Sequence, residues 1–261
     1  MTSHHEQSRE AEASVHGRTY LVCGASSGLG RAVADEILAR GGRVWAVARR
    51  PALADNDSSK ITRTRADLTT AAGVESVAQQ IVDAGQMLDG VLINGPGPRP
   101  GELFGLTGSD WHEALESLLI QPLHLISLLA DRLAPGSSIV FVTSSTVREP
   151  IPRLDASNVL RPAVAAAVNV LSKALAPRVR VNSIAPGRIA TSRLVEVEHA
   201  QAAGAHASVA DVRAGIVKDI PLGRYGTSAE FAAAAVFLLS PESAYITGAA
   251  LQVDGGLVRG A

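Results

Sequence analysis

The sequence predicts an α/β fold, a single-domain Rossmann-like doubly wound parallel sheet with helices on both faces. Short apolar runs alternate along the chain with segments of 12 or more residues whose apolar side chains recur at helical spacing. A glycine-rich turn joins the first apolar run to the first of these segments. Strands buried on both faces read as continuous apolar runs, and sheets of such strands are parallel and covered by helices.

The expected strands follow one another as short runs rich in apolar and β-branched side chains. We expect them at 19–23, 43–48, 91–93, 138–142, 179–184 and 250–253. The first helix should cover 30–40, because Val33, Ile37 and Leu38 recur at helical spacing. Longer helices are expected at 111–133 and 161–176. The first strand, the first helix and the second strand form a βαβ unit.

One domain is predicted for 17–261, because no change of composition, long linker or internal repeat divides that stretch. Residues 1–16 are polar and aperiodic, so we expect a disordered tail. The polar stretch 51–64 reads as an irregular connection, and the alanine-rich stretch 192–220 is helix-like but weakly patterned. Long segments near the carboxyl ends of parallel strands shape the ligand crevice. We therefore expect 192–220 to form a substrate lid, with an ordinary surface loop as the alternative.

Charge and cysteine content argue against several classes of partner. Lys and Arg number 24 against 25 Asp and Glu, a net charge of −1, so no basic stripe attracts nucleic acid. No apolar run reaches 18 residues and no signal-peptide pattern is present, so we expect no membrane partner. The single cysteine, Cys23, cannot form an internal disulfide, which favours a cytoplasmic location. No cluster has metal-ligand spacing, so we expect no metal.

A phosphate-binding loop is predicted at 23–30, where Gly24, Gly28 and Gly30 stand between a strand and a helix. The pyrophosphate of a dinucleotide needs a tight turn, a backbone that approaches it without Cβ atoms, and a helix amino terminus directed at it. The three glycines in this setting can meet all three needs.

The residues after the second expected strand favour NADP(H) over NAD(H). About 20 residues beyond the glycines, an acidic side chain would bind the ribose hydroxyls of NAD. That place is taken by Ala48, which is followed by Arg49 and Arg50. Guanidinium groups pair well with phosphate, and the repelling carboxylate is absent. The alternative is that both arginines are only solvated loop charges.

From about residue 17 to 258, the chain resembles the classical short-chain dehydrogenase/reductase family. The stretch 23–30 is similar to the family's Thr-Gly-x-x-x-Gly-x-Gly, with cysteine in place of threonine. Further matches are an Asp-Leu pair at 67–68, an Asn-Gly-Pro-Gly turn at 94–97, a Pro-Gly motif within 180–187, and carboxyl-terminal segments at 221–224, 246–248 and 253–256. The resemblance implies the fold, nucleotide binding and a homo-oligomer, either a tetramer or a dimer.

The resemblance also implies roles within the cofactor site. In the family the Asp-Leu pair contacts the adenine, the turn at 94–97 borders the nucleotide, and residues at Ile189 and Thr191 hold the nicotinamide carboxamide. The predicted cofactor-binding residues are Gly24, Ser26, Ser27, Gly28, Leu29, Gly30, Arg49, Arg50, Asp67, Leu68, Asn94, Gly95, Pro186, Gly187, Ile189 and Thr191.

The catalytic residues of the family are only partly matched. The family uses a serine that orients the carbonyl or alcohol and a tyrosine that acts as general acid or base. A lysine lowers the pKa of that tyrosine and binds the ribose, with an asparagine behind them. Ser145 directly follows an expected strand and matches the serine. Leu118 takes the asparagine position, so the support for a proton-relay water is absent.

Three alignments of the tyrosine and lysine remain open, and none restores either residue. Counting back from Asn182 with one deleted residue puts Ser157 at the tyrosine position and Arg161 at the lysine position. Counting 13 forward from Ser145 selects Asn158 instead. A third version sets Arg161 against the tyrosine and Ala165 against the lysine. A fainter resemblance is to an atypical branch of the family with Ser-Asn-x-Leu-Arg in this stretch. The candidate catalytic residues are Ser145, Arg161, Ser157 and Asn158.

We therefore expect an NADP(H)-dependent oxidoreductase that acts on a small carbonyl/alcohol substrate with an altered catalytic set. Serine and asparagine side chains do not titrate near neutral pH, whereas Arg161 is permanently cationic and can stabilise a developing alkoxide or contact a ribose hydroxyl. Glu149 is an acid/base candidate if it is buried; Tyr20, Tyr225, Tyr245 and His124 are expected in structural places. The alternative is a non-redox or catalytically silent member, a cyclase, a dehydratase or a pseudoenzyme subunit, that keeps the nucleotide-binding frame.

Overall fold

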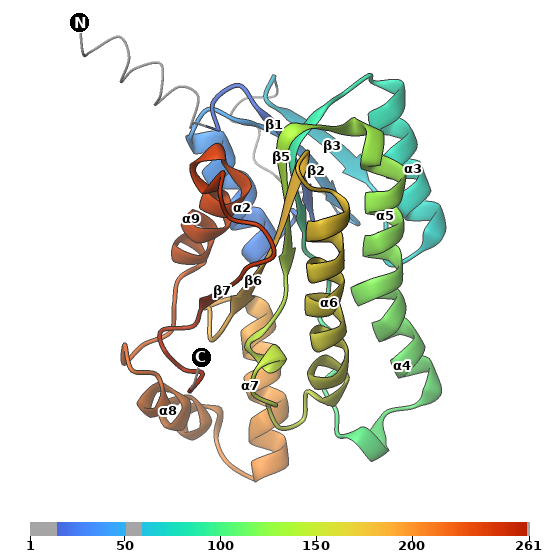
Figure 1. Cartoon of the computed structure of the whole chain (residues 1–261). Coiled ribbons are helices and arrows are strands. Elements are labelled where there is room, and N and C mark those ends of the chain that lie inside the picture. Colours follow the sequence, from blue (N-terminus) through green and yellow to red (C-terminus); the bar gives the residue numbers. More distant parts are fainter. Residues whose placement is uncertain (1–14, 51–58, 260–261) are drawn as a thin grey trace, which may run out of the picture.

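Seven parallel strands form one sheet in residues 15–50 and 59–259, the part of the chain that the computed structural model describes (Figure 1). Their order is β3-β2-β1-β4-β5-β6-β7, and every neighbouring pair runs parallel. The strands are β1 (Thr19–Cys23), β2 (Arg43–Ala48), β3 (Ile61–Arg65), β4 (Leu88–Ile93), β5 (Leu133–Val142), β6 (Val179–Pro186) and β7 (Ala250–Val253). The predicted α/β fold with a doubly wound parallel sheet is confirmed. Nearly all of the predicted tail lies outside the described residues.

Helices cover both faces of this sheet, which Figure 1 shows edge-on between them. α2 and α9 pack on one face, and α3, α5 and α6 pack on the other. The helices are α2 (Gly28–Ala39), α3 (Ala71–Asp83), α4 (Gly108–Leu115), α5 (Gln121–Leu129), α6 (Asp155–Ala174), α7 (Ser192–Ala205), α8 (Val209–Asp219) and α9 (Ser228–Leu239).

Each face of the sheet has its own apolar core. Alternate side chains of a strand point to opposite faces, so β1 sends Tyr20 and Val22 into one core and Leu21 and Cys23 into the other. All five residues of β1 are buried, which is why this central strand reads as an unbroken apolar run.

A helical stretch from 108 to 132 joins α4 and α5 through a π-helical turn, Glu116–Ile120. By length and composition alone, this stretch could cross a membrane. It contains no uninterrupted apolar run of 18 residues, because polar and charged residues stand between its apolar ones. In the fold its side chains Leu118, Leu125 and Leu129 are buried in the core beside the sheet. The stretch is therefore a core helix of this domain.

The structure corrects three expectations about the elements. The stretch expected to be irregular, 51–64, contains the start of β3, while 51–58 lie outside the described residues. β3 is an edge strand paired only with β2, so half of it is exposed and it lacks an apolar run. α6 begins at Asp155 rather than 161, because Pro162 stands inside the helix and not in its first turn. The helix-like stretch 192–220 divides into α7 and α8.

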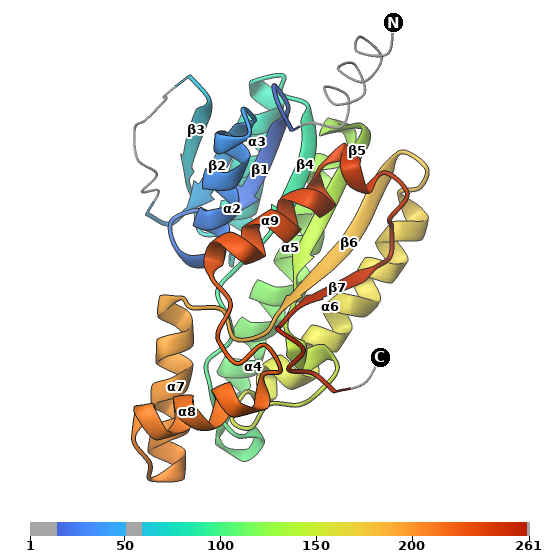
Figure 2. The ribbon, with the colours of Figure 1, turned by 90° about the vertical axis from the view of Figure 1, so that its left-hand side faces the viewer.

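Figure 2 shows the chain passing from α9 to β7, which lies beside β6 at the edge of the sheet. Arg180 in β6 ties this segment to the sheet. The residue is 9% exposed, and its guanidinium donates hydrogen bonds to the carbonyl oxygens of Leu238, Ser240 and Ile246 and to the Ser243 hydroxyl. Two residues on, Asn182 donates to the Ile246 carbonyl and accepts from the Ala249 amide. These bonds fix the chain that leads from α9 into β7.

We expect Arg180→Ala to lower the free energy of unfolding by about 3 kcal/mol, because several buried carbonyl groups lose a charged donor. Chemical denaturation followed by circular dichroism measures this change. Arg43 is exposed at the start of β2, so Arg43→Ala is the control and should alter the stability by less than about 0.5 kcal/mol. Equal effects of the two substitutions would show that Arg180 does not hold the segment.

Candidate functional site

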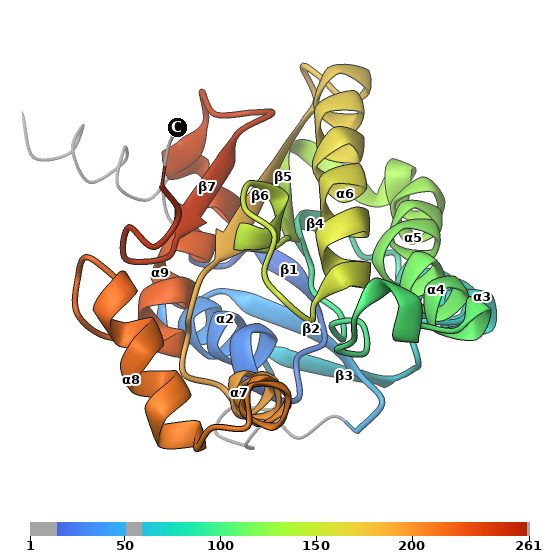
Figure 3. The ribbon, with the colours of Figure 1, turned by 90° about the horizontal axis from the view of Figure 1, so that it is seen from below.

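A pocket of about 620 Å³ lies at the carboxyl ends of the strands, the end of the sheet onto which Figure 3 looks. Its walls are built by residues that follow β1, β2, β3, β4, β5 and β6. α2, which follows β1, packs on one face of the sheet, whereas α5, which lies beyond β4, packs on the other. Because β1 and β4 are neighbours, the chain leaves them in opposite directions. Such a switch point is where open α/β sheets bind ligands.

The predicted site residues are brought together by this pocket. All of them line it except Gly30 and Asn158. Gly30 packs against the Gly24 carbonyl, and Asn158 is hydrogen-bonded to the loop beside the pocket.

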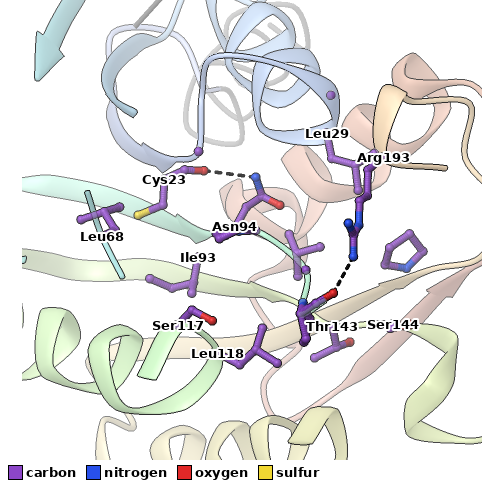
Figure 4. Close-up of a pocket in the computed structure, with 18 of the residues that line it drawn as sticks. Cys23, Leu29, Leu68, Ile93, Asn94, Ser117, Leu118, Thr143, Ser144 and Arg193 are labelled. Carbon is purple, nitrogen blue, oxygen red and sulfur yellow. Dashed lines mark hydrogen bonds between the residues drawn. The ribbon is translucent and has the colours of Figure 1, made fainter. Parts of the chain in front are cut away.

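Gly24 and Gly30 allow α2 to start directly against the end of β1. A Cβ atom on Gly30 would lie 2.3 Å from the Gly24 carbonyl oxygen, and one on Gly24 would lie 2.7 Å from Asn94 Nδ2. Gly24 also has a φ of +68°, which L side chains rarely adopt. Asn94 completes the contact by donating from Nδ2 to the Cys23 carbonyl at 3.4 Å (Figure 4). Gly30 thus serves the close packing of helix on strand.

The amino terminus of α2 faces the pocket with unsatisfied backbone N–H groups. Its N-cap, Ser27, makes no capping hydrogen bond with its side chain, and no acidic residue stands in the first turn. Ser26, Ser27, Gly28 and Leu29 all line the pocket. An uncapped helix start carries a partial positive charge as well as free donors, so this wall suits a phosphate group.

The wing of the pocket beyond β2 carries charge of both signs. Arg49 and Arg50 are exposed and line the pocket directly after the buried Ala48. Asp67 and Leu68 follow β3 and line the same wing. The Asp67 carboxylate accepts from the Thr69 amide and hydroxyl, so it is held by its own turn.

Ser145 and Ser157 face the pocket from the β5 side. Ser145 follows β5 and is 4% exposed, while Ser157 is in the first turn of α6 and is 9% exposed. Neither hydroxyl forms a hydrogen bond with another described residue, so both can bind a ligand. Ser157 and Arg161 are four residues apart on α6 and therefore share one face of the helix.

Arg161 brings a desolvated positive charge to the same end of the pocket. Its Nη1 donates to the Val142 carbonyl at 2.5 Å, and its Nε is buried without a partner among the described residues. Burial and, to a smaller extent, the nearby Arg193 guanidinium lower the pKa of Arg161 to about 10. At neutral pH the group is still a cation and cannot serve as an efficient acid.

Asn158 positions the loop beside the pocket. Its amide donates to the Ile151 carbonyl at 2.9 Å and to Asp155 at 3.1 Å, and its oxygen accepts from the Ile151 amide at 3.0 Å. These three bonds occupy the side chain and turn it away from the cavity. Ala165, from the third alignment, is also outside the lining. The alignment with Ser157 and Arg161 is thus the one whose two residues both line the pocket. Their assignment to the two family positions stays a prediction.

The start of α7 closes the pocket opposite α2. Pro186, Gly187, Ile189 and Thr191 lead from β6 into this helix and line the cavity. The Thr191 hydroxyl caps α7 by accepting from the Leu194 amide at 3.3 Å. Of the predicted lid, 192–194, 196 and 197 form wall, whereas no residue of α8 lines the pocket. Its opening and closing as a lid stay a prediction.

Two arginines of the pocket escape the sequence reasoning. Arg188 and Arg193 lie one and six residues after the Pro-Gly pair, and both line the cavity. Arg193 reaches into the pocket (Figure 4). It donates to the Pro98 carbonyl at 2.6 Å and pairs with Glu196 at 2.9 Å. Their positive charge and their nearness to the Pro-Gly motif are the features of the sequence that could have indicated a place in the pocket.

The other titratable candidates lie outside the pocket wall. Tyr20 is fully buried in the core, Tyr245 is fully exposed, and the Tyr225 hydroxyl donates to the buried Glu198 at 2.7 Å. His124 and Glu149 do not line the cavity, and Glu149 is exposed, so the condition for its acid/base role is not met. Leu118, which the family resemblance assigns to the asparagine position, does line the cavity. No tyrosine, lysine or histidine is found among the described lining residues.

Comparisons with known proteins cover almost the whole chain. A family model described as enoyl-(acyl carrier protein) reductase matches residues 24–258. The 3-oxoacyl-[acyl-carrier-protein] reductase of Salmonella typhimurium is 31% identical over 254 residues, 94% of this chain and 98% of that protein. A short chain dehydrogenase family protein from Francisella tularensis has a similar structure, with a TM-score of 0.85, 26% identity and coverage of 92% and 98% of the two chains.

A second solved structure is also similar in its fold. It is a short chain oxidoreductase from Pseudomonas aeruginosa, described as containing an atypical catalytic center. Its TM-score is 0.80 at 27% identity, and the match covers 94% of this chain and 98% of that one.

Cys23 should behave as an inert thiol in the folded protein. Burial raises its pKa to about 12, whereas a thiol in an unfolded chain ionises near pH ~8.5. The contribution of the neutral Cys23 thiol to the free energy of unfolding is therefore fully present below pH ~8.5. It is lost as the pH rises from there towards 12, because the thiol then ionises in the unfolded chain first. We expect a thiol reagent to modify Cys23 only after denaturant is added. Rapid modification of the native protein would contradict the burial, and Cys23→Ser, which should not react, is the control.

Proposed function

Because the chain belongs to the short-chain dehydrogenase/reductase family, we propose that it is an NADP(H)-dependent oxidoreductase that interconverts a carbonyl and an alcohol with an altered catalytic set. One observation carries the proposal. A single pocket at the switch point of the sheet joins the uncapped start of α2 to Ser145 and Arg161. The first feature suits a dinucleotide, and the second suits a carbonyl oxygen.

The residues present fit a nicotinamide dinucleotide. Gly24 and Gly28 both have positive φ, so the loop before α2 brings bare backbone to the pocket. The N–H groups of α2 would hold the pyrophosphate, and the Ile189–Thr191 turn would border the nicotinamide. When bound, the reduced cofactor supplies the hydride for the carbonyl carbon.

Ser145 and Arg161 would prepare the carbonyl group. The Ser145 hydroxyl is free to donate to the carbonyl oxygen, and the Arg161 charge stabilises the negative charge that develops there. One proton must then reach that oxygen to complete the alcohol. Because the described lining holds no tyrosine, lysine or histidine, we assign this proton to solvent water. A positioned acid contributes roughly 10²–10⁴-fold, so we expect slower turnover than with a tyrosine.

Preference for NADP(H) is supported by the end of β2. Ala48 supplies no carboxylate to bind the ribose hydroxyls of NAD(H), and Arg49 and Arg50 are exposed at the pocket where a 2′-phosphate would lie. The matches reported above give no support to the non-redox alternative. The Pseudomonas aeruginosa protein with its atypical center is a precedent for an altered set within such a fold. A cytoplasmic location stays a prediction.

Self-association is supported by the outer surface, although the homo-oligomer stays a prediction. Large apolar side chains are exposed on and around α5 and α6. They are Leu103, Phe104, Ile120, Leu128, Val159 and Val170. Figure 1 shows α5 and α6 on the same side of the sheet, so this surface could meet a second copy.

The proposal is tested by titrating the purified protein with NADPH and NADH and then adding carbonyl compounds to the NADPH complex. We expect NADPH to bind more tightly and its absorbance to fall as the carbonyl is reduced. Ser145→Ala should bind NADPH unchanged but reduce kcat by roughly 10²-fold, because the donor to the carbonyl oxygen is lost. Failure of both cofactors to bind would refute the proposal. Binding without oxidation by any member of a broad carbonyl panel would refute its redox part.

The cofactor preference is tested separately at the end of β2. We expect Ala48→Asp combined with Arg49→Ala to shift selectivity towards NADH by about tenfold or more, since one change adds a ribose ligand and the other removes a phosphate ligand. The measure is the ratio of kcat/KM for the two cofactors. Arg49→Lys keeps the charge and should keep most of the NADPH preference. Unchanged selectivity in the double variant would show that Arg49 does not contact the cofactor.

A further inference from the structure

Three guanidinium groups line one wing of the pocket, on the side of β5 and β6. Arg161 contacts the end of β5 through Val142, Arg188 follows β6, and Arg193 is in the first turn of α7. Arg49 and Arg50 lie beyond β2, which is separated from β5 by β1 and β4. The positive wing formed by Arg161, Arg188 and Arg193 is therefore distinct from the pair assigned to the 2′-phosphate.

The carboxylates near this positive wing do not neutralise Arg161. Glu196 forms an ion pair with Arg193. The buried Glu198 attracts the Arg188 guanidinium electrostatically. Glu198 also accepts a hydrogen bond from the Tyr225 hydroxyl and lies 3.8 Å from Arg213. The one charged side chain that acts appreciably on Arg161, among the described residues, is Arg193, which has the same sign. Two like charges are thus held together in a partly desolvated cavity, an arrangement that an anion between them would stabilise.

The hydrogen-bonding capacity of Arg161 is also unfilled. Its Nη1 donates to Val142, but neither Nε nor Nη2 has a partner among the described residues. Nε and Nη2 form one edge of the planar guanidinium, the edge that pairs with two oxygens of a carboxylate or phosphate. A buried N–H without a partner is unfavourable, and a bound oxyanion would relieve this cost.

We propose that Arg161 and Arg193 bind an oxyanion of the substrate, so that the enzyme acts on carbonyl compounds that carry a carboxylate or a phosphate close to the reacting carbon. This inference rests on the proposed function, because it places the oxyanion beside the carbonyl that Ser145 would orient. In an oxo acid the carboxylate lies one or two carbons from the carbonyl. One cation can then hold the acid group and stabilise the charge on the neighbouring oxygen.

The test measures binding in the complex with NADP⁺, in which a carbonyl compound cannot be reduced, so that turnover does not enter. Isothermal titration calorimetry measures the dissociation constants of 2- and 3-oxo acids of increasing length and of their methyl esters. It also compares hydroxyketone phosphates with the free hydroxyketones. We expect the anionic member of a pair to bind on the order of tenfold more tightly or better. The carboxylate and phosphate pairs show which oxyanion the site accepts. A panel in which no anion binds more tightly than its neutral partner overturns the inference.

Variants then assign the effect to the two arginines. Arg193→Gln and Arg161→Gln should each abolish most of the anion preference, and Arg161→Lys should restore part of it because it keeps the charge. Arg43→Gln makes the same charge change at the amino end of β2 and should leave the preference intact. If Arg193→Gln weakens NADP⁺ binding and leaves the anion preference unchanged, the residue serves the cofactor and the inference is wrong for it.

The outcomes separate this inference from the proposed function. If the protein without substitutions does not bind NADP⁺, both the proposed function and this inference are refuted. Tight NADP⁺ binding with reduction of neutral and anionic carbonyls at equal kcat/KM refutes only the oxyanion site.

Discussion

The close approach of the first helix to the first strand is the constraint on which the rest of the site depends. A single methyl group at Gly30 would overlap the Gly24 carbonyl, and one at Gly24 would overlap Asn94. With hydrogen at both positions, α2 starts directly at the end of β1 and its free N–H groups point into the crevice. Asn94 then fixes the end of β4 against the same turn. The wall that is proposed to hold the nucleotide thus depends mainly on close contacts of the backbone.

Ser157 and Arg161 stand one helical turn apart on the face of α6 that meets the cavity. Under the proposed function they take the two positions at which the family carries tyrosine and lysine. A hydroxymethyl group then replaces a larger phenol, and a guanidinium presents more donors than an ammonium. Under the proposed function, the site keeps hydride transfer and charge stabilisation but gives up its own acid. Arg188 and Arg193 make the same wing more cationic, which favours anionic partners.

The sequence predicts best what is buried on both faces. β1 and β6 are legible because nearly all of their residues are buried, whereas β3 is missed because this edge strand exposes Thr62 and Arg65 and has a single apolar residue. The phosphate loop follows from glycine spacing, since its chemistry is in the backbone. Asn158 illustrates the opposite case, because a residue aligned with a catalytic position is turned aside by three hydrogen bonds to its own loop. Arg193 could not be placed, because its role depends on where α7 crosses the crevice.

The pocket can be completed only after the segment 246–254 has been synthesised, because hydrogen bonds from this segment hold the end of β6. Gly187 forms pocket wall, yet its amide is bonded to the Val253 carbonyl and its Cα packs against Asp254. β6 likewise needs Ile246 and Ala249 to satisfy Asn182. Translation delivers these residues long after the glycine loop has been made. A nascent chain therefore exposes this loop before the opposite wall of the pocket is complete.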